Sequence, residues 1–242
     1  MRPSDDGWAL VTGASSGIGA AMARRLARDG WAVVLVGRDE ERLHGVADDC
    51  RSLGARDVRP LTVDIRDRER FAEIMRIIEP DAPVVLFVAC AGILDGRRDG
   101  EVVETAAVAH AVLDTNLTAT VEGVHTVLPS MIGRGHGGVV FVASLAALAP
   151  TPDAPAYSAS KAGLLAYGLA LRDALAPHGV RVCVACPGYV ATAMSARLIG
   201  RRPGEIDAEE AAERILRGLA RNRAVTVFPR TLGFLARLSG RA

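Results

Sequence analysis

Short apolar runs alternate along this chain with longer stretches in which apolar residues recur every three or four positions. The short runs are rich in valine and several are apolar throughout, as is typical of parallel strands that helices cover on both faces. The longer stretches have the period of amphipathic helices. This alternation predicts repeated β-α-β units, and therefore an α/β fold with a doubly wound parallel sheet.

The pattern predicts about seven strands and six helices. We expect strands over residues 8–12, 32–36, 57–63, 84–89, 138–143, 180–185 and 224–228. We expect helices over residues 17–29, 40–53, 67–78, 104–132, 156–176 and 208–221. No linker or change of composition separates these elements, so residues 1–242 are expected to form a single domain. Ligands bind such sheets at the carboxyl ends of the strands, so functional residues are expected just after each strand.

Charge and hydropathy argue against several classes of function. Lysine and arginine total 29 and acidic residues 28, which provides no broad positive field to attract nucleic acid. The longest apolar run, residues 82–93, is shorter than the ~18 residues that a membrane span requires. The N-terminal residues show no secretory signal, so a cytoplasmic location is expected.

The cysteine and histidine patterns predict neither a disulfide framework nor a metal site. Four cysteines are few for a chain of 242 residues, and the five histidines lack the spacing of metal ligands. Cys183 and Cys186 have the spacing of a redox or zinc motif, but they fall on a predicted strand. Residues three apart on a strand point to opposite faces, so both are expected to be buried thiols.

A glycine-rich segment follows the first predicted strand and opens onto the first predicted helix. It consists of Thr12, Gly13, Ala14, Ser15, Ser16, Gly17, Ile18 and Gly19. Glycines allow a tight turn, and the N–H groups and partial positive charge of a helix N-terminus bind a pyrophosphate. The segment therefore predicts a nucleotide site, with a plain glycine turn as the alternative.

Gly37 and Arg38 follow the second predicted strand. In dinucleotide-binding folds that use the unphosphorylated cofactor, an acidic residue usually lies here against the ribose 2′-hydroxyl. Gly37 removes that carboxylate, and Arg38 can hold a 2′-phosphate through charge-assisted hydrogen bonds. NADP(H) is therefore favoured over NAD(H). The alternative is that Arg38 is a solvated residue at the start of an acidic helix.

Tyr157 and Lys161 form the sharpest chemical motif, because residues four apart share one face of a helix. A nearby cation lowers a tyrosine pKa that otherwise lies near ~10, so the phenol can act as an acid and a base near neutral pH. Lys161 is the only lysine among 29 basic residues, which indicates a role that arginine does not fill. An exposed helix pair is the alternative.

These motifs together resemble the short-chain dehydrogenase/reductase family over nearly the whole chain. The resemblance rests on the glycine segment, Asp64-Ile65, Ala91-Gly92, Asn116, Ser144, Tyr157-x-x-x-Lys161, Pro187-Gly188 and Thr192, in the family's order and approximate spacing. It implies a Rossmann-like fold and hydride transfer between NADP(H) and a carbonyl/alcohol pair of small molecules. It also implies a homodimer or homotetramer.

The resemblance implies a role for each matching residue. Tyr157 would exchange a proton with the substrate oxygen, Ser144 would hydrogen-bond that oxygen, and Lys161 would bind the nicotinamide ribose. Asn116 would hold a water that links Lys161 to solvent. Further cofactor contacts would come from Asp64 and Ile65 in the adenine pocket, the Ala91-Gly92 backbone, and Pro187, Gly188, Val190 and Thr192 around the nicotinamide.

One motif departs from the family, whose Asn-Asn-Ala-Gly after the fourth strand is Ala89-Cys90-Ala91-Gly92 here. Hydrogen bonds from the two missing asparagines must come from elsewhere. The resemblance implies that residues 193–207 line the substrate pocket. Met194, Leu198 and Ile199 suggest an apolar wall, whereas Arg197, Arg201 and Arg202 form either a solvated face or contacts to an acidic substrate. The apolar tail, residues 230–242, is expected to pack on the body or join a subunit interface.

Two other functions stay open on the sequence. One is an NAD-dependent alcohol dehydrogenase of the same family. The other is a non-catalytic nucleotide-binding regulatory protein, because a fold alone does not fix a function.

Overall fold

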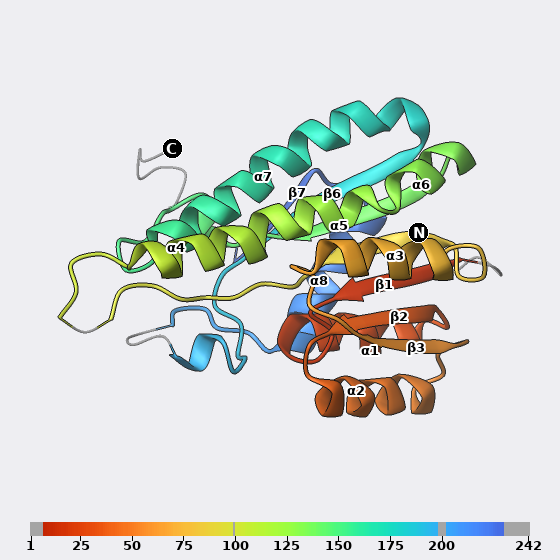
Figure 1. Ribbon diagram of the computed structural model, residues 1–242, viewed down its shortest axis with the longest axis horizontal. Coiled ribbons are helices and arrows are strands. Elements are labelled where there is room, and N and C mark those ends of the chain that lie inside the picture. The colour runs from red at the N-terminus through yellow and green to blue at the C-terminus, as the bar shows by residue number, and fades with distance from the viewer. Residues whose placement is uncertain (1–6, 99, 198–201, 230–242) are drawn as a thin grey trace.

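The computed structural model describes residues 7–98, 100–197 and 202–229. These residues form one parallel sheet with the strand order β3-β2-β1-β4-β5-β6-β7 (Figure 1). The strands are β1 (Trp8–Thr12), β2 (Ala32–Gly37), β3 (Val58–Thr62), β4 (Val84–Ala89), β5 (Gly137–Val142), β6 (Val180–Pro187) and β7 (Val225–Phe228). The order reverses between β1 and β4, which is where doubly wound sheets bind ligands. The predicted Rossmann-like fold is confirmed.

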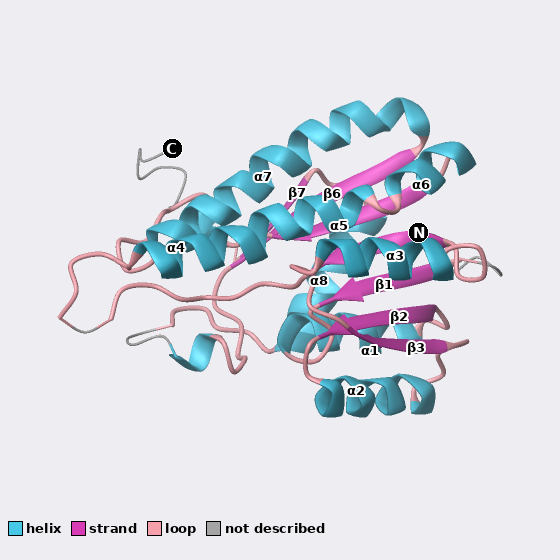
Figure 2. Cartoon of the chain, viewed as in Figure 1, coloured by secondary structure: helices cyan, strands magenta, loops and turns pink. Residues whose placement is uncertain are grey.

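Helices cover both faces of the sheet (Figure 2). They are α1 (Gly17–Arg28), α2 (Glu40–Ser52), α3 (Arg68–Ile78), α4 (Ala106–Leu113), α5 (Ala119–His125), α6 (Leu128–Arg134), α7 (Pro155–Leu175) and α8 (Ala208–Ala220). Buried side chains of α1, α2 and α8 pack on one face, and those of α3, α5, α6 and α7 pack on the other. Strands β2, β4 and β5 are apolar and buried throughout because both of their faces are covered.

The single helix predicted over residues 104–132 is wrong. The structure divides this stretch into α4, a π-helical turn over Asp114–Thr118, α5 and α6. The amide groups of Thr126 and Val127 donate to carbonyl groups only three residues earlier, which ends α5. Pro129 has no N–H and fits the first turn of a new helix, so the chain restarts as α6. The ends of the other predicted helices and of the strands lie within two residues of those observed.

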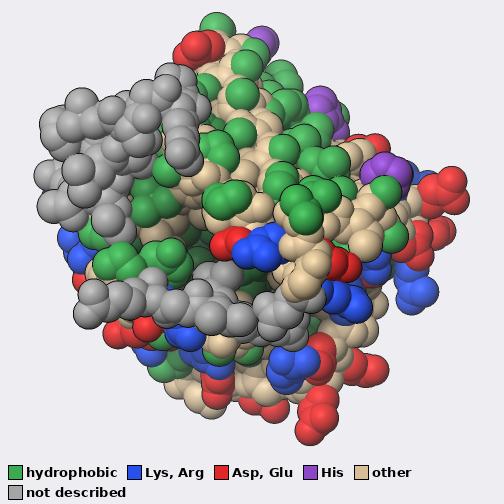
Figure 3. Space-filling model, turned by 90° about the vertical axis from the view of Figure 1, so that its left-hand side faces the viewer, with side chains coloured by type: hydrophobic (Ala, Val, Ile, Leu, Met, Phe, Trp, Pro, Cys, Tyr) green, Lys and Arg blue, Asp and Glu red, His purple; other side chains and the backbone are tan. Residues whose placement is uncertain are grey.

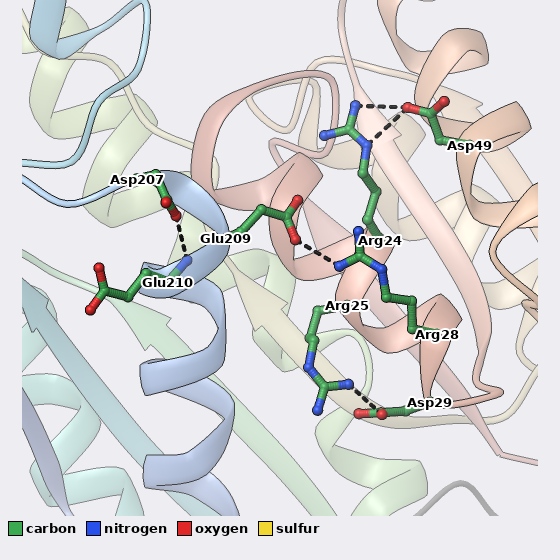
Figure 4. Close-up of polar contacts among 8 residues, drawn as sticks. All are labelled: Arg24, Arg25, Arg28, Asp29, Asp49, Asp207, Glu209 and Glu210. Carbon is green, nitrogen blue, oxygen red and sulfur yellow. Dashed lines mark hydrogen bonds and ion pairs between the residues drawn. The ribbon is translucent and has the colours of Figure 1, made fainter.

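Ion pairs join the helices on the α1 face (Figure 4). Arg28 contacts Glu209 at the start of α8 at 2.8 Å, and Arg24 contacts Asp49 of α2 at 2.9 Å. All four side chains are at least 30% exposed, so each pair contributes little to stability. Their effect is to fix how α1 lies between its two neighbours, and α1 begins at the carboxyl edge of the sheet.

Cys183 and Cys186 are buried, and their side chains belong to the clusters on opposite faces of the sheet. The expectation that both are buried thiols is confirmed. Within residues 7–98, 100–197 and 202–229 no group of three or more His, Cys, Asp or Glu side chains could hold a metal ion. Nor is any helix of this part of the chain long and apolar enough to cross a membrane.

Candidate active site

The segments that follow β1, β4, β5 and β6 meet at one edge of the sheet, because the strands run parallel. Figure 3 looks onto this edge, where apolar and charged side chains are mixed. Most of the predicted site residues come together here.

The glycine segment lies against residues at or just after the ends of three other strands, β2, β4 and β6. A Cβ on Gly13 would lie 2.8 Å from Ala91 Cα, after β4, and one on Gly17 would lie 3.1 Å from Thr192 Cγ2, after β6. A Cβ on Gly37, at the end of β2, would lie 3.2 Å from that of Ser15. Both Gly13 and Gly17 have positive φ, at +69° and +54°, which favours glycine. The segment is therefore a close-packed turn, as the sequence predicts.

The N-terminus of α1 suits an anionic group. Its N-cap, Ser16, makes no side-chain capping hydrogen bond, and its first turn carries no acidic residue. By contrast, the Asp39 carboxylate caps α2 by accepting from Arg42 N–H. Ile18 packs against the core and holds the start of α1 on the sheet. The first amides of α1, with the positive end of its dipole, form the arrangement that binds phosphate groups.

Thr12 braces the turn after β4, in which the family's two asparagines are replaced. Its hydroxyl accepts from the amides of Cys90 and Ala91, both at 3.1 Å, and donates to Val88 O at 3.4 Å. Thr12 is buried, and it ties the end of β1 to the turn after β4. The sequence shows Thr12 only as the start of the glycine segment and does not indicate this bracing role.

Replacing Thr12 with valine is expected to lower the free energy of unfolding by about 1–3 kcal/mol, because two amides lose their acceptor. Chemical denaturation of the wild-type and T12V proteins measures this. Val is close to Thr in shape, so the packing stays similar. Equal denaturation midpoints would mean that the Thr12 hydroxyl does not brace the β1–β4 edge.

Arg38 and Asp64 line a cavity of about 340 Å³ beside the ends of β2 and β3, together with Thr62, Val63, Asp67 and Arg70. The Arg38 side chain is 57% exposed, and its guanidinium lies 3.7 Å from the Asp64 carboxylate. Arg66 holds that carboxylate more closely, at 2.7 Å, and this hydrogen-bonded pair lowers the pKa of Asp64. Arg38 keeps this looser contact with Asp64, and its exposed side chain can also reach an anionic ligand at the mouth of the cavity. Ile65 packs into the core instead of lining it.

Ser144, Tyr157 and Lys161 meet where β5 ends and α7 begins. The Ser144 hydroxyl lies close enough to the phenol of Tyr157 to lower its pKa. Lys161 is 5% exposed, and its Nζ donates to Val142 O at 2.9 Å and lies 5.6 Å from the centre of the Tyr157 ring. Burial lowers the pKa of Lys161 to about 8.

The expectation that Lys161 lowers the pKa of Tyr157 is not met in this structure. Burial raises that pKa, and the nearby Ser144 hydroxyl opposes the rise. The reason is geometric: the Lys161 ammonium is directed to the Val142 carbonyl and lies over the face of the ring. The phenol is therefore protonated at neutral pH.

Asn116 ties the segment after β4 to α7. It lies in the π-helical turn and is fully buried. Its Oδ1 accepts from Ile93 N at 2.7 Å, and its Nδ2 donates to Ile93 O at 2.9 Å and to Ser160 Oγ at 3.2 Å. Ser160 is a site residue that the sequence does not single out.

Gly92 lies between Asn116 and Lys161. A Cβ on Gly92 would lie 3.1 Å from Asn116 Oδ1 and 3.5 Å from Lys161 Nζ. The turn after β4 therefore passes close to the side chains of Asn116 and Lys161, and glycine makes this approach possible.

The residues expected around the nicotinamide follow β6. Pro187 ends that strand, and Gly188 N donates to Phe228 O at 2.7 Å. A Cβ on Gly188 would lie 3.1 Å from Leu145 Cδ1, next to Ser144. The side chain of Val190 is buried in the core, so only its backbone is available at this edge.

Ser195 holds the turn that Thr192 begins. Its hydroxyl accepts from Thr192 N at 3.1 Å and donates to Val190 O at 2.6 Å. The sequence gives no signal for this role. Met194 is 38% exposed beside it. Leu198 and Ile199 of the expected apolar wall, Arg201, and the tail 230–242 lie outside the described residues.

Comparison with known proteins agrees with this geometry. Residues 7–202 match the model of the short chain dehydrogenase family. An uncharacterized oxidoreductase of Staphylococcus saprophyticus is 33% identical over 230 residues, which cover 94% of this chain and 97% of that protein.

Two solved structures are similar over almost their whole length. A short-chain dehydrogenase from Sphingobium yanoikuyae in complex with NADPH has a TM-score of 0.84 and 28% identity, and the match covers 97% of this chain and 94% of that one. A variant of the actinorhodin polyketide ketoreductase with NADPH has a TM-score of 0.85 and 29% identity, covering 96% and 99%. With the family match over most of the sequence, these likenesses establish that this chain belongs to the short-chain dehydrogenase/reductase family of oxidoreductase enzymes.

Proposed function

We propose that the protein is an NADP(H)-dependent oxidoreductase that interconverts a carbonyl group and a secondary alcohol. The observation that carries the proposal is the meeting of Ser144, Tyr157 and Lys161 at the edge where the glycine segment and α1 begin. A phenol and a serine hydroxyl that lie next to each other are a pair that can both hold and protonate a substrate oxygen.

The residues present fit the cofactor. The uncapped N-terminus of α1 and the turn from Gly13 to Gly19 suit the pyrophosphate, and Arg38 suits the 2′-phosphate. In the proposal, Lys161 binds the nicotinamide ribose, and the chain from Pro187 to Thr192 holds the nicotinamide. When bound, NADP(H) gives or takes the hydride.

Proton transfer belongs to the chain's own residues. Tyr157, kept protonated at neutral pH by burial, donates its proton to the substrate oxygen during reduction and takes it back during oxidation. Ser144 hydrogen-bonds the same oxygen as negative charge develops on it. We propose that the region of Asn116 holds a water through which Lys161 exchanges protons with solvent. The side-chain amide of Asn116 already donates to Ile93 and Ser160.

Two observations support NADP(H) over NAD(H). The Arg38 side chain is largely exposed at the mouth of the cavity, and the Asp64 carboxylate lies closer to Arg66, at 2.7 Å, than to Arg38, at 3.7 Å. The compared structures from Sphingobium yanoikuyae and of the actinorhodin ketoreductase are both complexes with NADPH.

Replacing Arg38 with alanine is expected to weaken NADPH binding by about tenfold to a hundredfold, because a charge-assisted contact to the phosphate is lost. NADH binding is expected to stay within twofold. Titrations of both cofactors, followed by nicotinamide fluorescence, measure the two dissociation constants.

The matched control for this titration is R42A. Arg42 lies four residues further along and pairs with Asp39 outside the cavity, so its removal is expected to leave both cofactors unaffected. Equal loss of NADPH and NADH binding in R38A would refute the role of Arg38. A wild-type preference for NADH would favour an NAD-dependent enzyme.

We further propose that residues 193–207 line the substrate pocket. The two ends of this segment are held together, because Ala191 N donates to Ile206 O at 2.9 Å and Ile206 N donates to Tyr189 O at 3.1 Å. A homodimer or homotetramer and a cytoplasmic location complete the proposal, and size-exclusion chromatography with light scattering tests the former.

A further inference from the structure

The helix that carries Tyr157 has no capping side chain of its own. Ala154 is the N-cap of α7, and Pro155 at the first position has no N–H. Ser158 N already donates to Ala154 O at 3.0 Å. The amides of Ala156 and Tyr157 are therefore the first donors of α7 that need an acceptor from outside the helix.

A carboxylate from a distant part of the chain provides one. Glu104 Oε1 accepts from Ala156 N–H at 2.6 Å, although the two residues are 52 positions apart. The Glu104 side chain is buried at 8% exposure, and its Oε2 has no hydrogen-bond partner among the described residues. A carboxylate is rarely buried in this way without a cation. The positive end of a 21-residue helix is the feature that favours it here.

A second attachment holds the same two segments together. Arg97 N donates to Asp153 O at 2.9 Å, and Arg97 Nε lies 2.7 Å from the Asp153 carboxylate. Next to it, a Cβ on Gly96 would lie 2.2 Å from Asp153 O. The long loop between β4 and α4, seen in Figure 1, is thus fixed to the chain just before Tyr157.

We infer that Glu104 is a positioning residue for Tyr157. By accepting the Ala156 amide it fixes the first turn of α7, and with it the direction in which the next residue presents its phenol to Ser144. A misplacement of about 1 Å in a reacting group costs on the order of a hundredfold in rate. The inference rests on the proposed function, because it presumes that Tyr157 is the acid and base.

The test compares four variants. E104A removes the acceptor, E104D withdraws it by one methylene while keeping the charge, and E104Q keeps an acceptor oxygen without the charge. T105A is the matched control. Thr105 is exposed, lies next to Glu104 in the same loop, and caps α4 by accepting from Val108 N at 3.3 Å.

Activity is measured as the reduction of simple ketones and β-keto esters by NADPH. We expect kcat to fall about tenfold to a hundredfold in E104A and E104D, with the dissociation constant of NADPH within twofold of wild type. E104Q is expected to restore kcat to within about threefold, and T105A to leave it unchanged. If Glu104 had a purely structural role, its variants would lose thermal stability, and kcat and NADPH binding would fall together. E104Q and E104D would then behave alike.

Hydrogen exchange gives a readout that does not depend on turnover. The amides of residues 155–161 are expected to exchange faster in E104A and E104D than in T105A. Wild-type kcat in E104A and E104D, or an equal loss in E104Q, would overturn the inference. If E104A does not fold, comparing kcat and hydrogen exchange between E104D and E104Q decides the same question. If the wild type does not reduce carbonyl groups, or if Y157F still does, the proposed function is contradicted. Hydrogen exchange of residues 155–161 would still test whether Glu104 fixes the first turn of α7.

Discussion

Replacing Tyr157 with phenylalanine is expected to lower kcat/KM for carbonyl reduction by about 10²–10⁴-fold, the usual contribution of a positioned acid and base. The change removes only the hydroxyl that lies next to Ser144. The ring that Lys161 lies against stays in place. NADPH binding is therefore expected to stay close to that of the wild type, so the loss falls on the chemical step. Steady-state kinetics and a NADPH titration measure both.

The chain offers a matched control for this variant on the same helix. Tyr167 also lies in α7, but its hydroxyl contacts His125 at 2.9 Å. Y167F makes the same chemical change and is expected to keep activity within twofold. Carbonyl reduction by Y157F within tenfold of the wild type would show that Tyr157 is not the proton donor.

Replacing Lys161 with methionine is expected to abolish most activity and yet to stabilise the protein at pH 7. Burial holds the pKa of Lys161 at about 8, against 10.5 for the free side chain. Keeping the buried amine charged at pH 7 therefore costs about 3 kcal/mol. Methionine removes this cost but leaves Val142 O without its donor, which costs about 1–3 kcal/mol. The net gain is expected to be up to about 2 kcal/mol.

The pH dependence of this gain identifies its cause. The folded protein binds the Lys161 proton more weakly than the unfolded chain does. The destabilisation is therefore full below pH 8, fades as the pH rises from about 8 to 10.5, and is absent above that. Urea denaturation of wild type and K161M across this range is expected to show the stability difference shifting in favour of the wild type. A difference independent of pH would mean that Lys161 is not destabilised by burial.

The fold could be predicted because its signals are local. Each strand is a short apolar run, and each helix except the stretch from 104 to 132 shows its period within one segment. The π-helical turn at Asp114–Thr118 could not be predicted, since Asn116 bonds with Ile93 and Ser160, which lie 23 and 44 residues away. No pattern within the stretch itself records those partners.

Some residues of the candidate site could likewise be predicted from the sequence, and others could not. The glycine segment and the Tyr157-Lys161 pair are visible because their spacing alone carries chemical meaning. Thr12 and Glu104 act through hydrogen bonds to distant backbone amides, and neither residue spacing nor composition indicates such contacts. The direction in which the Tyr157 pKa is shifted could not be predicted either, because it depends on where the Lys161 ammonium points once the helix is packed.

The buried amine of Lys161 has a practical consequence for labelling. At pH 8 about half of it is uncharged, whereas an ordinary surface lysine is less than about 1% uncharged. No other lysine side chain occurs in the sequence. An acylating reagent small enough to reach the pocket therefore has one side-chain amine to modify, and the extent of that modification reports directly on whether the pocket is shielded.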